Sequence, residues 1–174
     1  MGRSFAFQGS RMAYDASPSS THNPATGGTP TAAWGDIING NFEAIGAAWT
    51  SYTPTWSGTI GNGTVTGAYL KIGRTVHYRI SVTWGSTTSH AAATQTFTLP
   101  AAAHAFYVGN SAIGTGSAID ASTAIYTCTV LHTDSSSIVY MARDSNSTAV
   151  SNSAPFAFAT GDATVLVGTY EAAA

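Results

Sequence analysis

Residues 75–84 read Thr-Val-His-Tyr-Arg-Ile-Ser-Val-Thr-Trp, so that apolar and polar side chains alternate along the whole stretch. Successive side chains of a β-strand point to opposite faces of a sheet, and this alternation therefore predicts a strand with one buried and one solvated face. The face predicted to enter the core consists of Val76, Tyr78, Ile80, Val82 and Trp84. The opposite, solvated face consists of His77, Arg79, Ser81 and Thr83.

Further segments on both sides of this strand are rich in strand-forming residues and are separated by turn-forming sequences. They are residues 64–72, 94–99, 105–113, 123–132, 136–142, 155–160 and 163–170. Loops are expected where Gly, Asn, Asp, Ser and Thr gather, including residues 61–63, 85–94 and 114–122. Short strands at this spacing predict a mainly β fold, an antiparallel β-sandwich of jelly-roll-like type over residues 50–174.

The composition agrees with one β-rich domain. The chain has 174 residues, and two full-sized domains of half that length would both be marginally stable. Charged residues make up 8% of the chain, against roughly 25% in an ordinary soluble domain, so Ser, Thr, Asn and Gly must cover much of the surface. The net charge of −2 gives weak repulsion between copies, which favours a subunit packed in an assembly over a free monomer.

Charge and cysteine content disfavour several classes of function. The six Lys and Arg residues are scattered and form no basic patch for a phosphate backbone, so nucleic acid is not an expected partner. Cys128 is the only cysteine, which excludes an intrachain disulfide and a cysteine-based zinc site. No apolar run is long enough to span a bilayer, and the first residues lack the apolar stretch of a secretory signal. We therefore expect synthesis in a cytoplasm and no membrane partner.

Residues 31–49 change to a helical period. Large apolar side chains recur every three or four residues, which predicts a short amphipathic helix with one apolar stripe: Trp34, Ile38, Phe42, Ile45 and Trp49. This helix needs packing partners, because glycine costs about 0.5–1 kcal/mol relative to Ala at each of its interior positions. The helix could pack on its own β-domain, or several copies could join in a short bundle. We favour the bundle, which makes the stripe an oligomer interface.

Residues 1–30 cannot form a core of their own, because four large apolar residues are followed by a stretch rich in Pro, Ser, Thr and Gly. One interpretation is a disordered tail, as chain ends often are. The other is an extended docking arm that becomes ordered on a partner protein, with its anchors at Phe5, Phe7, Met12 and Tyr14. The expected organisation is thus an arm at 1–30, an oligomerisation helix at 31–49 and a β-sandwich at 50–174.

Three stretches resemble a β-rich surface domain that recurs in virion proteins of the tailed phages of actinobacteria. The first is Trp-Thr-Ser-Tyr-Thr-Pro-Thr-Trp at residues 49–56, the second covers residues 60–76, and the third combines residues 84–88 with 97–100. The resemblance extends well over residues 31–100 and only in general style beyond them. It implies a protein of the minor tail, tail fibre or decoration type. It also implies a trimer, and it carries no catalytic residues with it.

Some residues of these stretches have a physical interpretation of their own. Pro54 has no amide hydrogen and is expected in an edge strand or at the start of one, which would turn Tyr52 and Trp56 toward the core. Gly61-Asn62-Gly63 is expected to supply positive φ angles for a tight reversal. These residues are interpreted as determinants of the fold.

The sequence contains no pattern that predicts an active site. The histidines show no close ligand spacing, and the loop aspartates form no calcium-binding loop, so no metal is expected at His22, His77, His90, His104 or His132. No serine lies in a G-x-S-x-G motif, and Cys128 lies within a predicted strand. We expect neither a cofactor nor an enzymatic activity.

Together these features lead to the expectation of a non-enzymatic structural protein of a bacteriophage virion. The leading hypothesis is a homotrimeric tail appendage, docked on other virion proteins through its arm, with its sandwich on the virion surface and loops able to touch host cell-surface glycans. One alternative is a capsid decoration protein that coats or stabilises the head. A second is a carbohydrate-active depolymerase, which the scarcity of paired carboxylates disfavours.

Overall fold

The structure is a computed structural model that describes residues 42–43, 45–91, 94–109, 111–133, 135–143 and 148–174. The chain divides into two compact units, Met1–Gly46 and Ala47–Ala174, and the second unit is called the β-domain below. Outside the described residues lie the anchors of the predicted arm and the first part of the predicted helical stripe: Phe5, Phe7, Met12, Tyr14, Trp34 and Ile38.

The described residues of the first unit are helical and lead into a turn. Phe42, Glu43 and Ile45 are helical, and the amide nitrogen of Gly46 donates a hydrogen bond to the carbonyl oxygen of Phe42 at 2.9 Å. Residues 47–49 have no regular structure, so the prediction that the helix reaches Trp49 is wrong. Glycine at position 46 disfavours a further helical turn, and the β-branched Thr50 already begins a strand.

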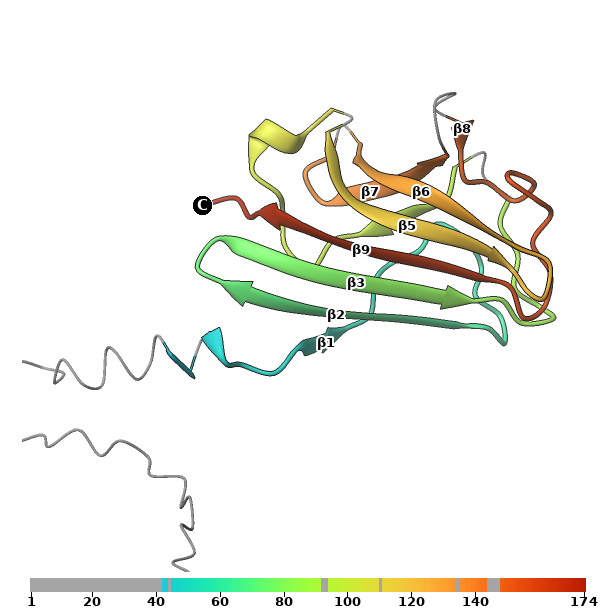
Figure 1. Ribbon diagram of the computed structural model, residues 1–174, viewed down its shortest axis with the longest axis horizontal. Helices are drawn as coiled ribbons and strands as arrows, with labels where there is room; N and C mark the ends of the chain where they lie inside the picture. Colours follow the sequence, from blue (N-terminus) through green and yellow to red (C-terminus); the bar gives the residue numbers. More distant parts are fainter. Residues whose placement is uncertain (1–41, 44, 92–93, 110, 134, 144–147) are drawn as a thin grey trace, which may run out of the picture. The chain divides into compact units, whose positions relative to one another are not determined.

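The β-domain consists of one antiparallel sheet, in which the described residues form nine strands. The elements are β1 (Thr50–Tyr52), β2 (Thr64–Ile72), β3 (Thr75–Thr83), β4 (Thr96–Thr98), the 3₁₀ helix η1 (Ala105–Tyr107), β5 (Ala112–Asp120), β6 (Ala124–His132), β7 (Ile138–Arg143), β8 (Thr148–Ala149) and β9 (Ala163–Glu171). The strand order is β1-β2-β3-β9-β5-β6-β7-β4, and β8 pairs with β7. Figure 1 shows β1, β2, β3, β9, β5 and β6 side by side in this order. The prediction of a mainly β, antiparallel fold is confirmed, and the curled sheet is consistent with a sandwich.

The two ends of this sheet are joined by the segment that follows β1. Strand β1 pairs with β2, and only a few residues later Trp56 forms a bridge with Phe97 of β4 at the other end of the strand order. Two backbone hydrogen bonds flank the bridge, from the Thr98 amide to the Thr55 carbonyl at 3.0 Å and from the Ser57 amide to the Thr96 carbonyl at 3.1 Å. The buried Pro54 lies between the two pairings, where its missing amide hydrogen removes no hydrogen bond of the sheet.

The core lies on the inner side of the curled sheet. The predicted alternation of β3 is confirmed, since Val76, Tyr78, Ile80 and Val82 are buried while Arg79 and Thr83 are exposed. They form one buried cluster with residues from the other strands, among them Trp56, Trp84, Phe97, Ile113, Val130, Val139, Met141, Leu166 and Tyr170. Cys128 is buried in β6, in agreement with its prediction as a strand residue.

The region between residues 105 and 122 differs from the prediction. The strand predicted at 105–113 is η1 followed by a turn at Gly109, and most of the loop predicted at 114–122 is strand β5. Gly114 and Gly116 suggested a loop, but they pair with Gly168 and Leu166 of β9. A β-carbon on Gly114 would come within 2.9 Å of the Tyr78 hydroxyl oxygen, so the missing side chain makes room for a core tyrosine.

Two further local expectations are corrected. Residues 155–160, predicted as a strand, have no strand structure, and Phe156 and Phe158 instead pack against the core cluster. Of the two glycines in the turn at 61–63, Gly61 has the expected positive φ of 55°, whereas Gly63 does not. Position 63 has no room for a side chain, because a β-carbon there would overlap the Thr88 side chain and the Thr83 carbonyl oxygen.

The structure buries His132 completely at the end of β6. Its Nδ1 lies 3.3 Å from the carbonyl oxygen of Thr133. Loss of hydration on burial disfavours the charged imidazolium and lowers the pKa of His132 below its ordinary value of 6.5.

The closure of the sheet predicts a large effect of Phe97 on stability. Phe97→Ala should lower the free energy of unfolding by about 3–5 kcal/mol, because a fully buried ring is removed and leaves a cavity. The matched control is Phe106→Ala, whose ring is 76% exposed on η1 and whose loss should cost less than about 0.5 kcal/mol. Urea unfolding at one protein concentration measures both values, and equal losses would contradict the assignment of Phe97 to the core.

Burial of neutral His132 predicts a loss of stability in acid. The unfolded chain takes up a proton on this histidine near pH 6.5, whereas the folded chain does so only at lower pH. The contribution of His132 to the free energy of unfolding is therefore complete above pH 6.5 and decreases as the pH falls below it. In urea unfolding at pH 7.5 and 5.5, His132→Gln should lose less stability between the two pH values than the unchanged protein. A loss of the same size would show that another group causes the acid sensitivity.

Candidate functional site

The predicted oligomer interface is represented among the described residues by Phe42, Ile45 and Trp49. The side chains of Phe42 and Ile45 are 68% and 56% exposed, although both are large and apolar. They lie three residues apart on the helical residues of the first unit, which places them on the same side of a helix. Their role in an interface stays a prediction.

Trp49 belongs to the β-domain and is not part of the helix. Its ring is 40% exposed, and the guanidinium carbon of Arg79 lies 4.8 Å from the ring centre in a cation–π contact. The spacing of the apolar residues placed Trp49 on the helical stripe. Gly46 and the strand-forming residues of β1 were the signals in the sequence that could have separated it from that stripe.

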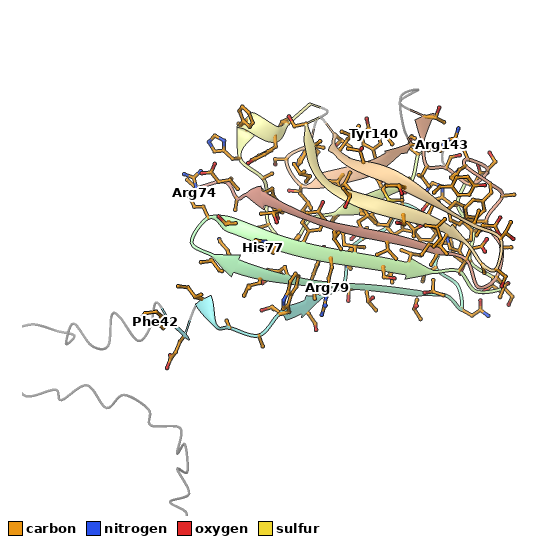
Figure 2. The ribbon with its side chains drawn as sticks, in the orientation of Figure 1. Phe42, Arg74, His77, Arg79, Tyr140 and Arg143 are labelled. Atoms are coloured by element: carbon orange, nitrogen blue, oxygen red, sulfur yellow. The ribbon has the colours of Figure 1, made fainter. Side chains whose placement is uncertain are left out.

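Arg79 lies on the solvent side of the sheet, which is called the outer face below. The strand register aligns it with Ala68 of β2, Val167 of β9 and, next to Val167, Thr115 of β5. Figure 2 shows His77 and Arg79, both on β3, whose side chains alternate with those of its buried residues. His77 Nδ1 lies 2.8 Å from the Thr169 hydroxyl oxygen on the neighbouring strand β9. Around Arg79, the described residues of the outer face thus combine short hydroxyl and aliphatic side chains with His77 and the ring of Trp49.

Hydrogen bonds and strand pairing hold parts of the predicted loops 85–94 and 114–122 in place. Residues 85–88 are tied to the turn at 61–63, because the Asn62 Oδ1 accepts hydrogen bonds from the amide and the hydroxyl of Thr87, both at 2.9 Å. The Asn62 amide group in turn donates to the Ser86 hydroxyl at 3.0 Å. The predicted loop 114–122 is reduced to the short turn of the β5–β6 hairpin, where Ser122 has a positive φ of 67°.

Aromatic rings at the end of the sheet near Trp84 pack on one another. Trp84 stacks on Phe158 with ring centres 4.8 Å apart, and Phe158 contacts Phe156 at 4.4 Å. Trp84 also contacts Trp56 edge to face at 5.5 Å. Such contacts stabilise aromatic pairs beyond simple burial, so these rings hold the segment around residues 156–158 against the core.

The acidic groups of the β-domain that make described contacts have structural roles. The buried Asp162 accepts hydrogen bonds from the amides of Ala121 at 2.8 Å and Ala159 at 2.6 Å, which connects the β5–β6 turn to the segment before β9. Glu171 forms an ion pair with Arg74 at 3.1 Å. Within the described residues, no three His, Cys, Asp or Glu side chains are grouped as ligands for a metal ion.

The buried tyrosines are held in their neutral form. Burial raises the pKa of Tyr78 and of Tyr52 above the ordinary value of 10 and raises the pKa of Tyr170 to about 12. The Tyr170 hydroxyl donates to the Ala101 carbonyl oxygen at 2.7 Å, and it accepts from the Ala101 amide at 3.2 Å. Near neutral pH these phenols therefore act as neutral packing groups, and those of Tyr170 and Tyr52 also form hydrogen bonds.

No helix in the described part of the chain has the length and apolar character needed to cross a bilayer.

A scan against protein-family models finds no matching family. A search of curated proteins finds no match. Among solved structures, the chain is similar to the fibre head protein of bovine atadenovirus type 4. The sequence identity is 8%, the alignment covers 70% of this chain and all of the viral chain, and the TM-score is 0.30. A TM-score of this size does not establish a shared fold.

Proposed function

We propose that this chain is a non-enzymatic structural protein of a bacteriophage virion, a self-associating surface appendage of the tail of the minor tail or fibre type. In this proposal residues 1–30 attach the protein to other virion proteins, the helical stripe joins copies into a homotrimer, and the β-domain is presented on the virion surface. The protein is made in the cytoplasm of the bacterial host and needs no cofactor.

The exposure of Phe42 and Ile45 is the observation that carries this proposal. Exposed apolar side chains that are adjacent on a helix mark an interaction surface in a soluble protein. The β-domain already has its own continuous core and a sheet whose two ends are joined, so it does not depend on these side chains. Self-association covers them, and three copies is the number implied by the resemblance to phage virion proteins.

The stretch that resembles phage surface domains forms one packing unit in the structure. A β-carbon on Gly67 would come within 2.6 Å of the Tyr52 ring and 2.9 Å of the Pro54 ring, so both side chains lie directly on this glycine. Tyr52 also contacts Tyr69 edge to face, with ring centres 5.8 Å apart. The residues on which the resemblance rests are therefore also residues that determine how the sheet closes.

The proposal predicts that charge on the stripe separates the copies. Phe42→Asp combined with Ile45→Asp should convert the assembly to monomers, because desolvating two carboxylates in an apolar interface is strongly unfavourable. Sedimentation velocity at micromolar concentration measures the assembly state, and near-ultraviolet circular dichroism checks that the β-domain keeps its packing. Phe106→Asp is the matched control, since Phe106 is equally exposed but lies on η1, and it should leave the trimer intact.

The decisive observations on the intact chain are its assembly state and its position on the particle. A stable monomer at micromolar concentration would refute self-association. Antibodies against the β-domain should label the tail of purified particles in electron microscopy. Label on the head would instead identify a capsid decoration protein, and absence from purified particles would refute a structural role in the virion.

A further inference from the structure

Two open hollows lie on the outer face of the sheet, one on each side of Arg79. The first has a volume of about 430 Å³, and its polar lining includes the hydroxyl groups of Ser51, Thr66 and Ser81. The second has a volume of about 530 Å³ and is lined by residues that include Trp49, His77, Thr115 and Thr169. Arg79 and Val167 line both, so the two hollows are adjacent parts of one surface.

The guanidinium of Arg79 is held in place without a described acidic partner. Its described contact is the cation–π contact with the Trp49 ring, and the ion pair among the described residues joins Arg74 to Glu171 instead. The described residues that line the two hollows include no aspartate or glutamate. A cation–π contact uses the charge of the guanidinium and leaves its N–H groups available as hydrogen-bond donors. Arg79 is thus oriented and still has donors for an anion.

This arrangement matches the chemistry of an acidic sugar. A carboxylate or phosphate group can accept two parallel hydrogen bonds from one guanidinium. The hydroxyl groups on both sides suit the hydroxyls of a sugar ring, and Trp49 and Val167 offer apolar surface to the C–H groups of that ring. We propose that the outer face binds an acidic saccharide, with Arg79 on its anionic group and Trp49 beside the sugar ring.

The openness of the site favours an oligosaccharide. Small-molecule sites have similar volumes, roughly 300–1,000 Å³, but enclose most of their ligand. Here the hollows are open and continuous across strands, which suits an extended chain that makes many weak contacts. Several copies on one particle would add avidity to such contacts. That the saccharide belongs to a host cell surface rests on the proposed function, whereas binding itself follows from the site.

A second copy of this chain fits the site less well. The β-domain has three described acidic residues, and of these Asp162 is buried and Glu171 is paired with Arg74. Among the described acids only Asp120 and, in the first unit, the exposed Glu43 then remain to complement Arg79. A sugar acid supplies the negative charge that the described surface of the protein largely lacks.

The test measures binding of the full chain to matched saccharides by isothermal titration calorimetry. The carboxylate probe is an oligogalacturonate, and its control is the same oligosaccharide as the methyl ester, which removes the charge but keeps the sugar. The phosphate probe is mannose 6-phosphate, with mannose as its control. At least one acidic probe should bind about tenfold or more tightly than its neutral control, as expected for charge-assisted hydrogen bonds.

Variants then show which residues recognise the acid. Arg79→Gln should weaken binding about tenfold or more, and Trp49→Ala should also weaken it, whereas Trp49→Phe should retain part of the affinity. Lys71→Gln removes one positive charge from the neighbouring strand, at a position that pairs with the inward-facing Val76, and should change the affinity less than about twofold. Circular dichroism confirms that each variant is folded.

Several outcomes would overturn the proposal. These are equal binding of acidic and neutral probes, no binding to either acidic probe at millimolar concentration, and equal effects of Arg79→Gln and Lys71→Gln. A change of assembly state in Arg79→Gln would show that this face contacts another copy instead. The binding measurement does not depend on where the protein sits on a virion or on how many copies assemble, so its failure is distinguishable from failure of the proposed function.

Discussion

The pairing of residues 55–57 with β4 joins the two ends of the sheet, and the rest of the β-domain depends on this closure. Without it, β1 and β4 would expose unpaired backbone groups, which invite pairing with other chains. Closure also brings Trp56 against the core side of β3, where it meets Trp84. The chain reaches the closing position through Pro54, which packs with Tyr52 on Gly67. A short stretch before the first long strand therefore determines how the remaining strands enclose their core.

A surface with few charges is the second constraint. The outer face carries mostly Thr, Ser, Val and Ala, which are compatible with a pleated sheet in water without long charged side chains. On such a face a single guanidinium acts with little competition from neighbouring charges. The same composition weakens repulsion between copies, which suits the proposed assembly through Phe42 and Ile45 with an exposed sheet. In these proposals, assembly and recognition belong to different units of the chain.

Several elements could be predicted from local pattern because their burial follows from the sequence alone. The inward and outward residues of β3 were correct, and β2 matched the predicted residues 64–72. The errors concern glycine and aromatic residues. Gly114 and Gly116 are residues typical of loops, but they lie in strand β5. There, Tyr78 and Met141 occupy the space that a side chain would need. Phe156 and Phe158 are residues typical of strands, but they lie in an irregular segment, where Phe158 packs on Trp84 and Phe156 on Tyr126.

The amino-acid sequence alone determined the fold class, the approximate bounds of β2, β3, β6 and β9, and the face that β3 buries, because these depend on the residue pattern along a single strand. It also determined the low charge and the apolar residues ahead of the β-domain. Only the tertiary structure decided that Trp49 leaves the helical stripe and stacks on Arg79, that His132 is buried, and that the ends of the sheet meet at Trp56 and Phe97. Each of these depends on a contact between segments far apart in the chain, and no local period of the sequence encodes which distant residue will be the partner.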